Sequence, residues 1–166
     1  MSGQALVTIN EDQWAVFVAT TYEELTTGLS GQSSINAGTG MLFVLPTIQV
    51  VTVDTTQMLF PLDIIFISNN IVIDVARGIL PGNLVTEETP CDSFLEINAG
   101  EAVAVGAGDA VTIAMVSGGG FDFSQVVSFA IPLTVLGFVC AMASGVLKSG
   151  SSPHSSKERP MLYGPK

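Results

Sequence analysis

The stretch PLDIIFISNNIVIDVA, residues 61–76, decides the fold of this chain. It holds two runs of apolar and β-branched residues, 64–67 and 71–75, separated by Asn69-Asn70. Asparagine tolerates the positive φ that a two-residue type I′ turn requires. The stretch therefore predicts a β-hairpin.

Similar runs recur on both sides of this hairpin. They lie at residues 5–9, 14–19, 41–45, 49–53, 94–97 and 110–116, and turn-forming residues bound them. Short strands at this spacing predict a mainly β fold, a small barrel or sandwich-like domain rather than a parallel sheet. One helix is predicted at residues 22–27, because Thr21 can cap it, Glu24 completes a capping box and Gly28 can end it.

Charge divides the chain into an acidic part and a basic part. Residues 1–125 contain fourteen acidic residues and one basic residue, Arg77, which sum to −13, whereas residues 148–166 contain four basic and one acidic, which sum to +3. With 48% hydrophobic and 12% charged residues the chain does not have the composition of a disordered protein. The acidic part would repel a phosphate backbone, so no nucleic-acid partner is expected.

Between the two parts lies an uncharged segment, VVSFAIPLTVLGFVCAMASGVL, residues 126–147. As a helix, its 22 residues would reach roughly 33 Å, which matches a bilayer core of about 30 Å. Gly137, Ala141 and Gly145 are four residues apart, the spacing that allows close helix packing. We expect a transmembrane helix in contact with lipid or neighbouring apolar helices; a helix buried in an oligomeric assembly is the alternative.

These features divide the chain into four parts. They are a β domain (1–116), a Gly-rich linker (117–125), the hydrophobic helix (126–147) and a basic polar tail (148–166). The first fourteen residues lack the basic and long apolar regions of a secretory signal, so the helix would act as its own insertion signal. The positive-inside rule then predicts a single span with the tail in the cytoplasm and the domain outside. A tail-anchored protein with its domain in the cytoplasm is the alternative.

Several motifs follow one another in a recognisable order: TTYEELTTGLSG (20–31), GMLFV (40–44), PLDI (61–64), LEINAG (95–100) and GD (108–109). With these motifs, residues 7–116 resemble the prokaryotic family called domain of unknown function 192. The resemblance implies a compact, mostly antiparallel β fold, a small antiparallel β barrel or sandwich-like domain with one or two short helices, and no established enzymatic activity. The chain departs from the family pattern at Thr27, where members carry arginine or lysine, and at residues 53–58, which lack an aromatic residue and a lysine. A ligand site built on those groups is therefore not predicted here.

Three acidic residues in the matched motifs are candidate metal ligands: Asp63, Glu96 and Asp109. Three converging carboxylates could hold Ca²⁺ or Mg²⁺, or share a proton. The favoured interpretation is structural, because an aspartate beside a turn can accept hydrogen bonds from the turn's backbone amides. We therefore predict no metal and no cofactor.

Catalysis by a nucleophile is also disfavoured. The chain's one histidine, His154, lies in the tail, so Cys91 and the serines of the domain have no imidazole base nearby in sequence. Trp14, within a β run, is expected in the core. We predict no enzymatic activity, and a metal-dependent hydrolase is the least favoured class.

Two classes of function remain. The first is a non-catalytic, membrane-tethered β domain that acts as an accessory or assembly subunit of a larger complex, with other proteins or copies of itself as partners. The second is a structural component of a virus particle or a similar repeating assembly. There the apolar helix would pack against its copies or a particle membrane.

Overall fold

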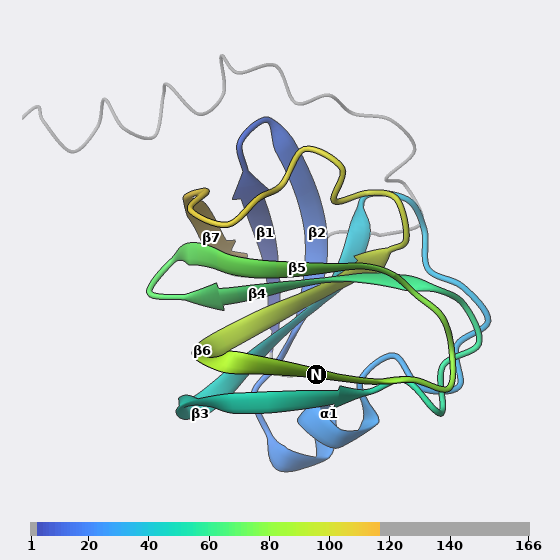
Figure 1. Ribbon diagram of the computed structural model, residues 1–166. Helices are drawn as coiled ribbons and strands as arrows, with labels where there is room; N and C mark the ends of the chain where they lie inside the picture. The colour runs from blue at the N-terminus through green and yellow to red at the C-terminus, as the bar shows by residue number, and fades with distance from the viewer. Residues whose placement is uncertain (1–2, 117–166) are drawn as a thin grey trace, which may run out of the picture. The chain divides into compact units, whose positions relative to one another are not determined.

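The computed structural model describes residues 3–116, which fold as seven β-strands and one short helix (Figure 1). The elements in chain order are β1 (Gly3–Ile9), β2 (Asp12–Ala19), α1 (Tyr22–Thr27), β3 (Thr39–Asp54), β4 (Leu62–Ser68), β5 (Ile71–Ile79), β6 (Leu84–Asn98) and β7 (Val111–Met115). The mainly β class predicted from the sequence is confirmed. Among the described residues one helix is present.

The hairpin predicted at residues 61–76 is confirmed as β4 and β5. The two strands pair antiparallel from Ser68 and Ile71 outward. Asn69 and Asn70 form the turn with φ values of 52° and 60°. Both angles are positive, as a type I′ turn requires.

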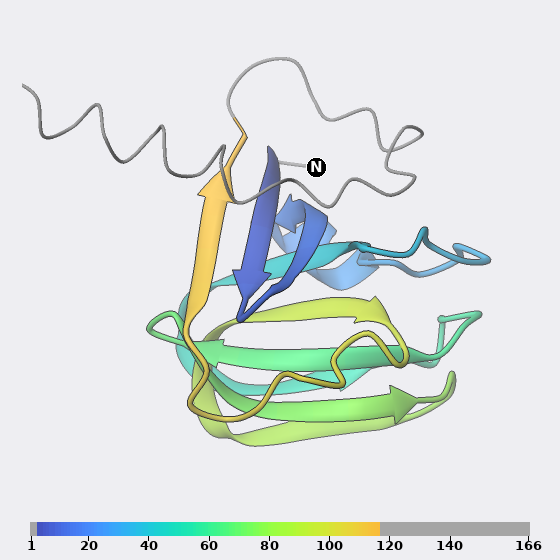
Figure 2. The same cartoon turned by 90° about the horizontal axis from the view of Figure 1, so that it is seen from above.

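All seven strands belong to one sheet, in the order β5-β4-β6-β3-β2-β1-β7. Every pair is antiparallel except β2 with β3, which are parallel. The sheet curls so that its two end strands approach each other: Ile71 at the start of β5 forms a bridge with Ala110, just before β7. Backbone hydrogen bonds from Val72 N to Asp109 O (2.9 Å) and from Val111 N to Asn70 O (2.8 Å) hold this contact. Figure 2 shows β7 beside β1 at one end of the curled sheet.

The expectation of short strands is wrong for β3 and β6, which have 16 and 15 residues. The runs 41–45 and 49–53 belong to the single strand β3, and β6 begins ten residues before the run 94–97. Each long strand bends where the pairing between them shifts register, between Val44 and Val51 of β3. Such irregularities bend and twist a strand without ending it. Beyond the bend, β3 and β6 continue as a two-stranded ribbon, residues 45–54 and 84–92, which passes below β4 and β5 in Figure 1.

The two faces of the sheet bury separate clusters of apolar side chains. Successive residues of a strand point to opposite faces, so Ile65 and Ile67 of β4 join one cluster, and Ile64 and Phe66 join the other. The first cluster includes Trp14, which is 2% exposed, as expected for a core residue. The second cluster combines side chains from the strands, from the ribbon and from the region around α1. In this cluster the rings of Phe43 and Phe94 stack with their centroids 4.5 Å apart.

Helix α1 has the predicted boundaries and caps. The backbone N of Glu24 donates to Thr21 Oγ1 (3.3 Å), and Glu24 Oε2 accepts from the backbone N of Thr21 (3.2 Å). This reciprocal pair is the capping box. Gly28 follows the helix with a φ of 49°, a conformation that glycine adopts without strain.

The linker (117–125), the hydrophobic segment (126–147) with Gly137, Ala141 and Gly145, and the tail (148–166) with His154 lie outside the described residues. Within residues 3–116, no helix has the length and apolar character needed to cross a bilayer.

Candidate functional site

Buried Asp63 of β4 holds the loop that follows β6. Its Oδ1 accepts a hydrogen bond from Gly78 N (2.8 Å), and its Oδ2 accepts from Gly100 N (2.9 Å) and Ala102 N (3.0 Å). Because the side chain is 1% exposed, these amides replace the water that a carboxylate would otherwise require. Asp63 therefore fixes the loop and an irregular part of β5.

Asp109 fixes the far end of the same loop. Its Oδ2 accepts from Gly106 N (2.7 Å) and from the side-chain amide of Asn10 (2.8 Å). Asn10 lies in the turn between β1 and β2 with a φ of 55°. The structural interpretation of Asp63 and Asp109, that they bond turn amides, agrees with these contacts.

Two further charged residues, Arg77 and Glu101, connect the loop to other strands. Arg77 of β5 donates to the carbonyl oxygens of Ala102 (3.2 Å from Nε and 3.1 Å from Nη2) and Val105. Glu101, within the loop, accepts from Trp14 Nε1 (2.9 Å). The Glu101 carboxyl also accepts from the Asn98 side chain (3.2 Å) and from the backbone N of Gly38 (3.2 Å). Our sequence reasoning did not identify Glu101, because nothing in its local pattern shows that Trp14, 87 residues away, would reach it.

Glu96 of β6 differs from all these residues. It is 5% exposed, and its side chain has no hydrogen-bond or ionic partner among residues 3–116. Met41 of β3 and Ile64 of β4 lie directly opposite it in the sheet register, so both share its face. Burial among apolar groups raises the pKa of Glu96 to about 8. The carboxyl is therefore mainly neutral at pH 7.

The three candidate carboxylates do not converge. Asp63 pairs with Ile97 in the sheet and faces the first core cluster, whereas Glu96 faces the second. Asp109 lies beyond the sheet, against Asn10. Among residues 3–116, no group of three or more histidine, cysteine, aspartate or glutamate side chains is placed to hold a metal ion.

A hollow of about 280 Å³ lies beside the second core cluster, between α1 and β3. It is lined by Thr21, Glu23, Glu24, Thr27, Gly28 and Met41. Met41 is buried, and the lining residues of α1 are more exposed. Thr27, one of the positions at which the chain departs from the family pattern, thus lines this hollow together with Met41 of β3.

Comparison with known proteins agrees with the fold. No curated protein matches the chain. A crystal structure of a protein of unknown function from Novosphingobium aromaticivorans DSM 12444 has 26% identity and a TM-score of 0.61, over 66% of this chain and 83% of that one. A structure from Sinorhizobium meliloti 1021, described as a candidate transcription regulator, has 20% identity and a TM-score of 0.62, over 67% of this chain and 92% of that one. At this identity the second likeness shows the fold alone.

The family resemblance is confirmed, because residues 5–113 of this chain match the sequence profile of domain of unknown function 192, described as "Uncharacterized ACR". This match covers most of the described residues and every motif from GMLFV to GD. The chain belongs to the domain of unknown function 192 family.

Proposed function

We propose that this chain is a non-catalytic, membrane-tethered β domain that serves as an accessory or assembly subunit of a larger complex. The observation that carries the proposal is an unpaired strand edge on the ribbon of β3 and β6. Strand β2 pairs with β3 only as far as Phe43. From there to Asp54, β3 is hydrogen-bonded to β6 on one side, and no described strand covers its other side.

The exposed edge has the composition of a pairing surface. Residues 47–53, TIQVVTV, carry no charge and are rich in β-branched residues. Ile48 and Val50 are 55% and 49% exposed. An edge of this kind can accept an extended segment of another chain through main-chain hydrogen bonds.

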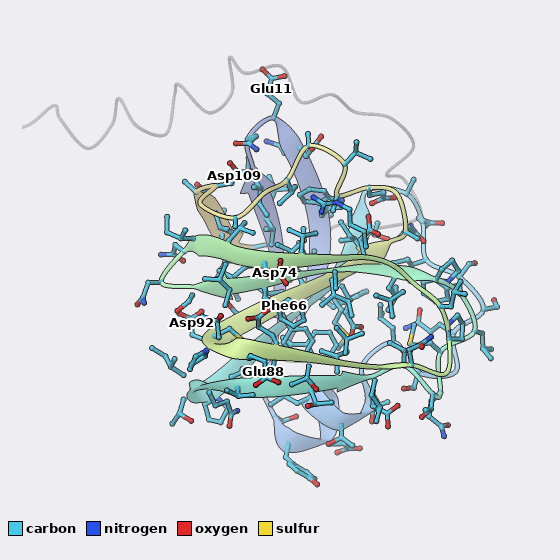
Figure 3. The ribbon with its side chains drawn as sticks, in the orientation of Figure 1. Glu11, Phe66, Asp74, Glu88, Asp92 and Asp109 are labelled. Carbon is cyan, nitrogen blue, oxygen red and sulfur yellow. The ribbon has the colours of Figure 1, made fainter. Side chains whose placement is uncertain are left out.

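The charge of the domain favours a basic partner. Arg77, the one basic residue in residues 1–125, directs its guanidinium to loop carbonyls, whereas acidic residues such as Glu88 and Asp92 lie on or next to the ribbon (Figure 3). A sum of −13 opposes close contact between two copies of the domain. A protein with a basic strand or surface would complement it.

The chemistry of the candidate nucleophile supports a non-catalytic role. The Cys91 side chain is buried, and burial followed by the charges of Asp92 and Glu87 raises the pKa of its thiol. A thiol with a raised pKa forms little of the reactive thiolate at neutral pH. The side-chain oxygens of Asp63 and Asp109 accept hydrogen bonds from backbone and side-chain amides.

The membrane tether rests on the sequence of residues 126–147, an uncharged run of bilayer length followed by a basic tail. A tether would keep the ribbon edge near the partners within one membrane. Local confinement raises the effective concentration of a weakly binding edge.

Cross-linking and co-purification of the full chain from its native membrane or particle test this function. The Ile48→Lys, Val50→Lys double variant should lose its cross-linked partner, because two charges on the edge oppose strand pairing. Leu80→Lys, which changes a 62% exposed residue at the turn after β5, is the matched control and should retain the partner. Equal cross-linking by both variants and the unchanged chain would refute the role of the β3 edge in binding a partner. Extraction without detergent would refute the membrane tether, and co-sedimentation with a particle of fixed stoichiometry would support the alternative of a virus-like assembly.

A further inference from the structure

The exposed leucines of residues 3–116 gather in two neighbouring loops. Leu59 lies between β3 and β4, and Leu80 and Leu84 bound the turn between β5 and β6. Their exposed fractions are 63%, 62% and 66%. Both loops lie at the end of the β4–β5 hairpin opposite the Asn69-Asn70 turn, at the right in Figure 1. Residues 55–61 and 80–84 are called the leucine loops below.

Buried Thr55 ties the two leucine loops together. It is 1% exposed, its backbone N donates to Asn83 O (2.8 Å), and its backbone O accepts from Gly82 N (2.9 Å). Its hydroxyl accepts from Asn83 N and donates to Leu80 O, both at 3.0 Å. Because a rearrangement of the loops would break these buried hydrogen bonds, the leucines are held at the surface.

The leucine loops carry no charge, although residues 1–125 sum to −13. The charged residues nearest to them in sequence are Asp54, Asp63, Arg77 and Glu87. Each of these four makes hydrogen bonds to backbone groups of the domain itself. The loops therefore form an uncharged, apolar end on an otherwise acidic domain.

This pattern matches the surface of an electrically neutral bilayer. Apolar side chains gain free energy when they enter the boundary between headgroups and acyl chains. An acidic domain is repelled by anionic lipids, so its uncharged end suits zwitterionic lipids best. The sequence also supplies a means of bringing a bilayer within reach: nine residues, 117–125, join the domain to the bilayer-length segment 126–147 and could span up to roughly 30 Å when extended.

We propose that the leucine loops rest on an electrically neutral lipid bilayer, with Leu59, Leu80 and Leu84 among the headgroups. This inference rests on the membrane tether proposed above and gives the tethered domain an orientation. Ile48 of the unpaired β3 edge lies six residues before Asp54, roughly 20 Å along the strand from the leucine loops. The lipid contact thus leaves that edge free for a partner.

The test places a fluorophore at each end of the β4–β5 hairpin in the full chain. Leu80→Cys and Ile71→Cys each receive a nitrobenzoxadiazole label, whose emission depends on the polarity around it. Ile71 is 40% exposed and begins β5, and the seven residues of β4 separate the two positions by about 23 Å. Cys140→Ser in both proteins removes a competing thiol, and Cys91 is buried. The proteins are reconstituted in phosphatidylcholine vesicles with and without nitroxide-labelled acyl chains.

We expect the label at Leu80→Cys to emit at a shorter wavelength and to lose most of its intensity to the nitroxides. The label at Ile71→Cys should emit as it does in water and keep its intensity. Equal quenching at the two positions, or none at Leu80→Cys, would overturn the proposal. A shift to shorter wavelength without quenching would show that protein covers the loops and would overturn it as well.

Two further variants tie the lipid contact to the leucines. In the Leu80→Cys protein, Leu59→Ser with Leu84→Ser should restore water-like emission, because the apolar area that enters the lipid is lost. Val50→Ser, which changes a 49% exposed residue of the β3 edge, is the matched control and should leave the quenching unchanged. Quenching that survives both leucine substitutions would contradict the proposal, and so would stronger quenching when anionic phosphatidylglycerol is added.

Carbonate extraction of the same vesicles separates this inference from the tether. A chain that stays in the pellet with an unquenched Leu80→Cys label would refute the loop contact alone. A chain that carbonate releases, but whose label was quenched before extraction, would refute the tether and support the loop contact.

Discussion

Asp63 and Glu96 occupy neighbouring register positions on the paired strands β4 and β6, but their side chains lie on opposite faces of the sheet. Asp63 is opposite Ile97, and Glu96 is opposite Ile64. Because side chains alternate along a strand, the offset of one residue separates the two carboxyl groups completely. One becomes an anchor bonded to three amides, and the other remains without a partner in the described residues.

The first prediction concerns the two anchoring aspartates. Asp63→Asn should lower the free energy of unfolding by roughly 2–3 kcal/mol. The side-chain NH2 group of asparagine would replace a carboxylate oxygen, so backbone N–H donors would lose their acceptor. Asp109→Asn, with fewer bonds and greater exposure, should cost about 1 kcal/mol. Urea unfolding of the full chain in detergent solution, followed by the fluorescence of Trp14, measures both. An equal cost for the two variants would contradict the role assigned to Asp63.

The second prediction is a pH dependence set by Glu96. Its pKa is about 8 in the folded protein and near 4.5 in the unfolded chain. Below pH 4.5 the group is protonated in both states, so its ionisation does not change the stability with pH. Between pH 4.5 and 8 the folded state retains a proton that the unfolded state has released, so stability falls by up to about 1.4 kcal/mol per pH unit.

Glu96→Gln removes this titration. The variant should therefore lose less stability than the unchanged chain between pH 5 and 8 and should be the more stable of the two at pH 8. Urea midpoints across this range measure the difference, and titrations common to both proteins cancel. Parallel curves for the two proteins would show that Glu96 ionises normally in the folded state.

The third prediction concerns the close approach of β3 and β6. A Cβ atom at Gly40 would overlap the carbonyl oxygen of Glu96 and lie 2.8 Å from Ile97 Cγ2. Gly40→Ala should therefore destabilise the domain by about 1–3 kcal/mol through overpacking. Gly106→Ala is the control, since its Cβ would meet its nearest neighbour at 4.0 Å. Thermal unfolding of both variants decides, and a Gly40→Ala midpoint no lower than that of Gly106→Ala would refute the steric reason.

The fourth prediction concerns the hydrophobic segment. Replacing Gly137 and Ala141 with leucine should weaken cross-linking between neighbouring subunits, because larger side chains prevent close helix packing. Membrane insertion should persist, since leucine raises the hydrophobicity of residues 126–147. Carbonate extraction measures insertion separately from cross-linking. Cross-linking that survives both substitutions would exclude this face as the contact.

The fifth prediction is that a chain ending at Gly120 folds and remains in solution without detergent. The described strands bury many of their apolar side chains in two clusters formed by residues 3–116. Gel filtration and the fluorescence of Trp14 would verify this. Aggregation of the shortened chain, while the full chain stays soluble in plain buffer, would mean that residues 126–147 belong to the domain core.

Local sequence determined the features that depend on a few adjacent residues. Asn69-Asn70 between two β-branched runs fixed the hairpin of β4 and β5, because the turn's positive φ angles are a local property. The Thr21 and Glu24 pair fixed the start of α1 in the same way. The ordered motifs, from GMLFV to GD, identified the family.

Only the tertiary structure decided which partners these elements found. The structure joined two predicted strands into β3 and paired β2 with β3 in parallel. It also formed the hydrogen bond from Trp14 to Glu101, which are 87 positions apart. Local pattern cannot specify such contacts, since they depend on how the whole sheet curls. The same reason separates Asp63 from Glu96: sequence places both in family motifs, but the register of β4 against β6 gives amide donors to one and an apolar face to the other.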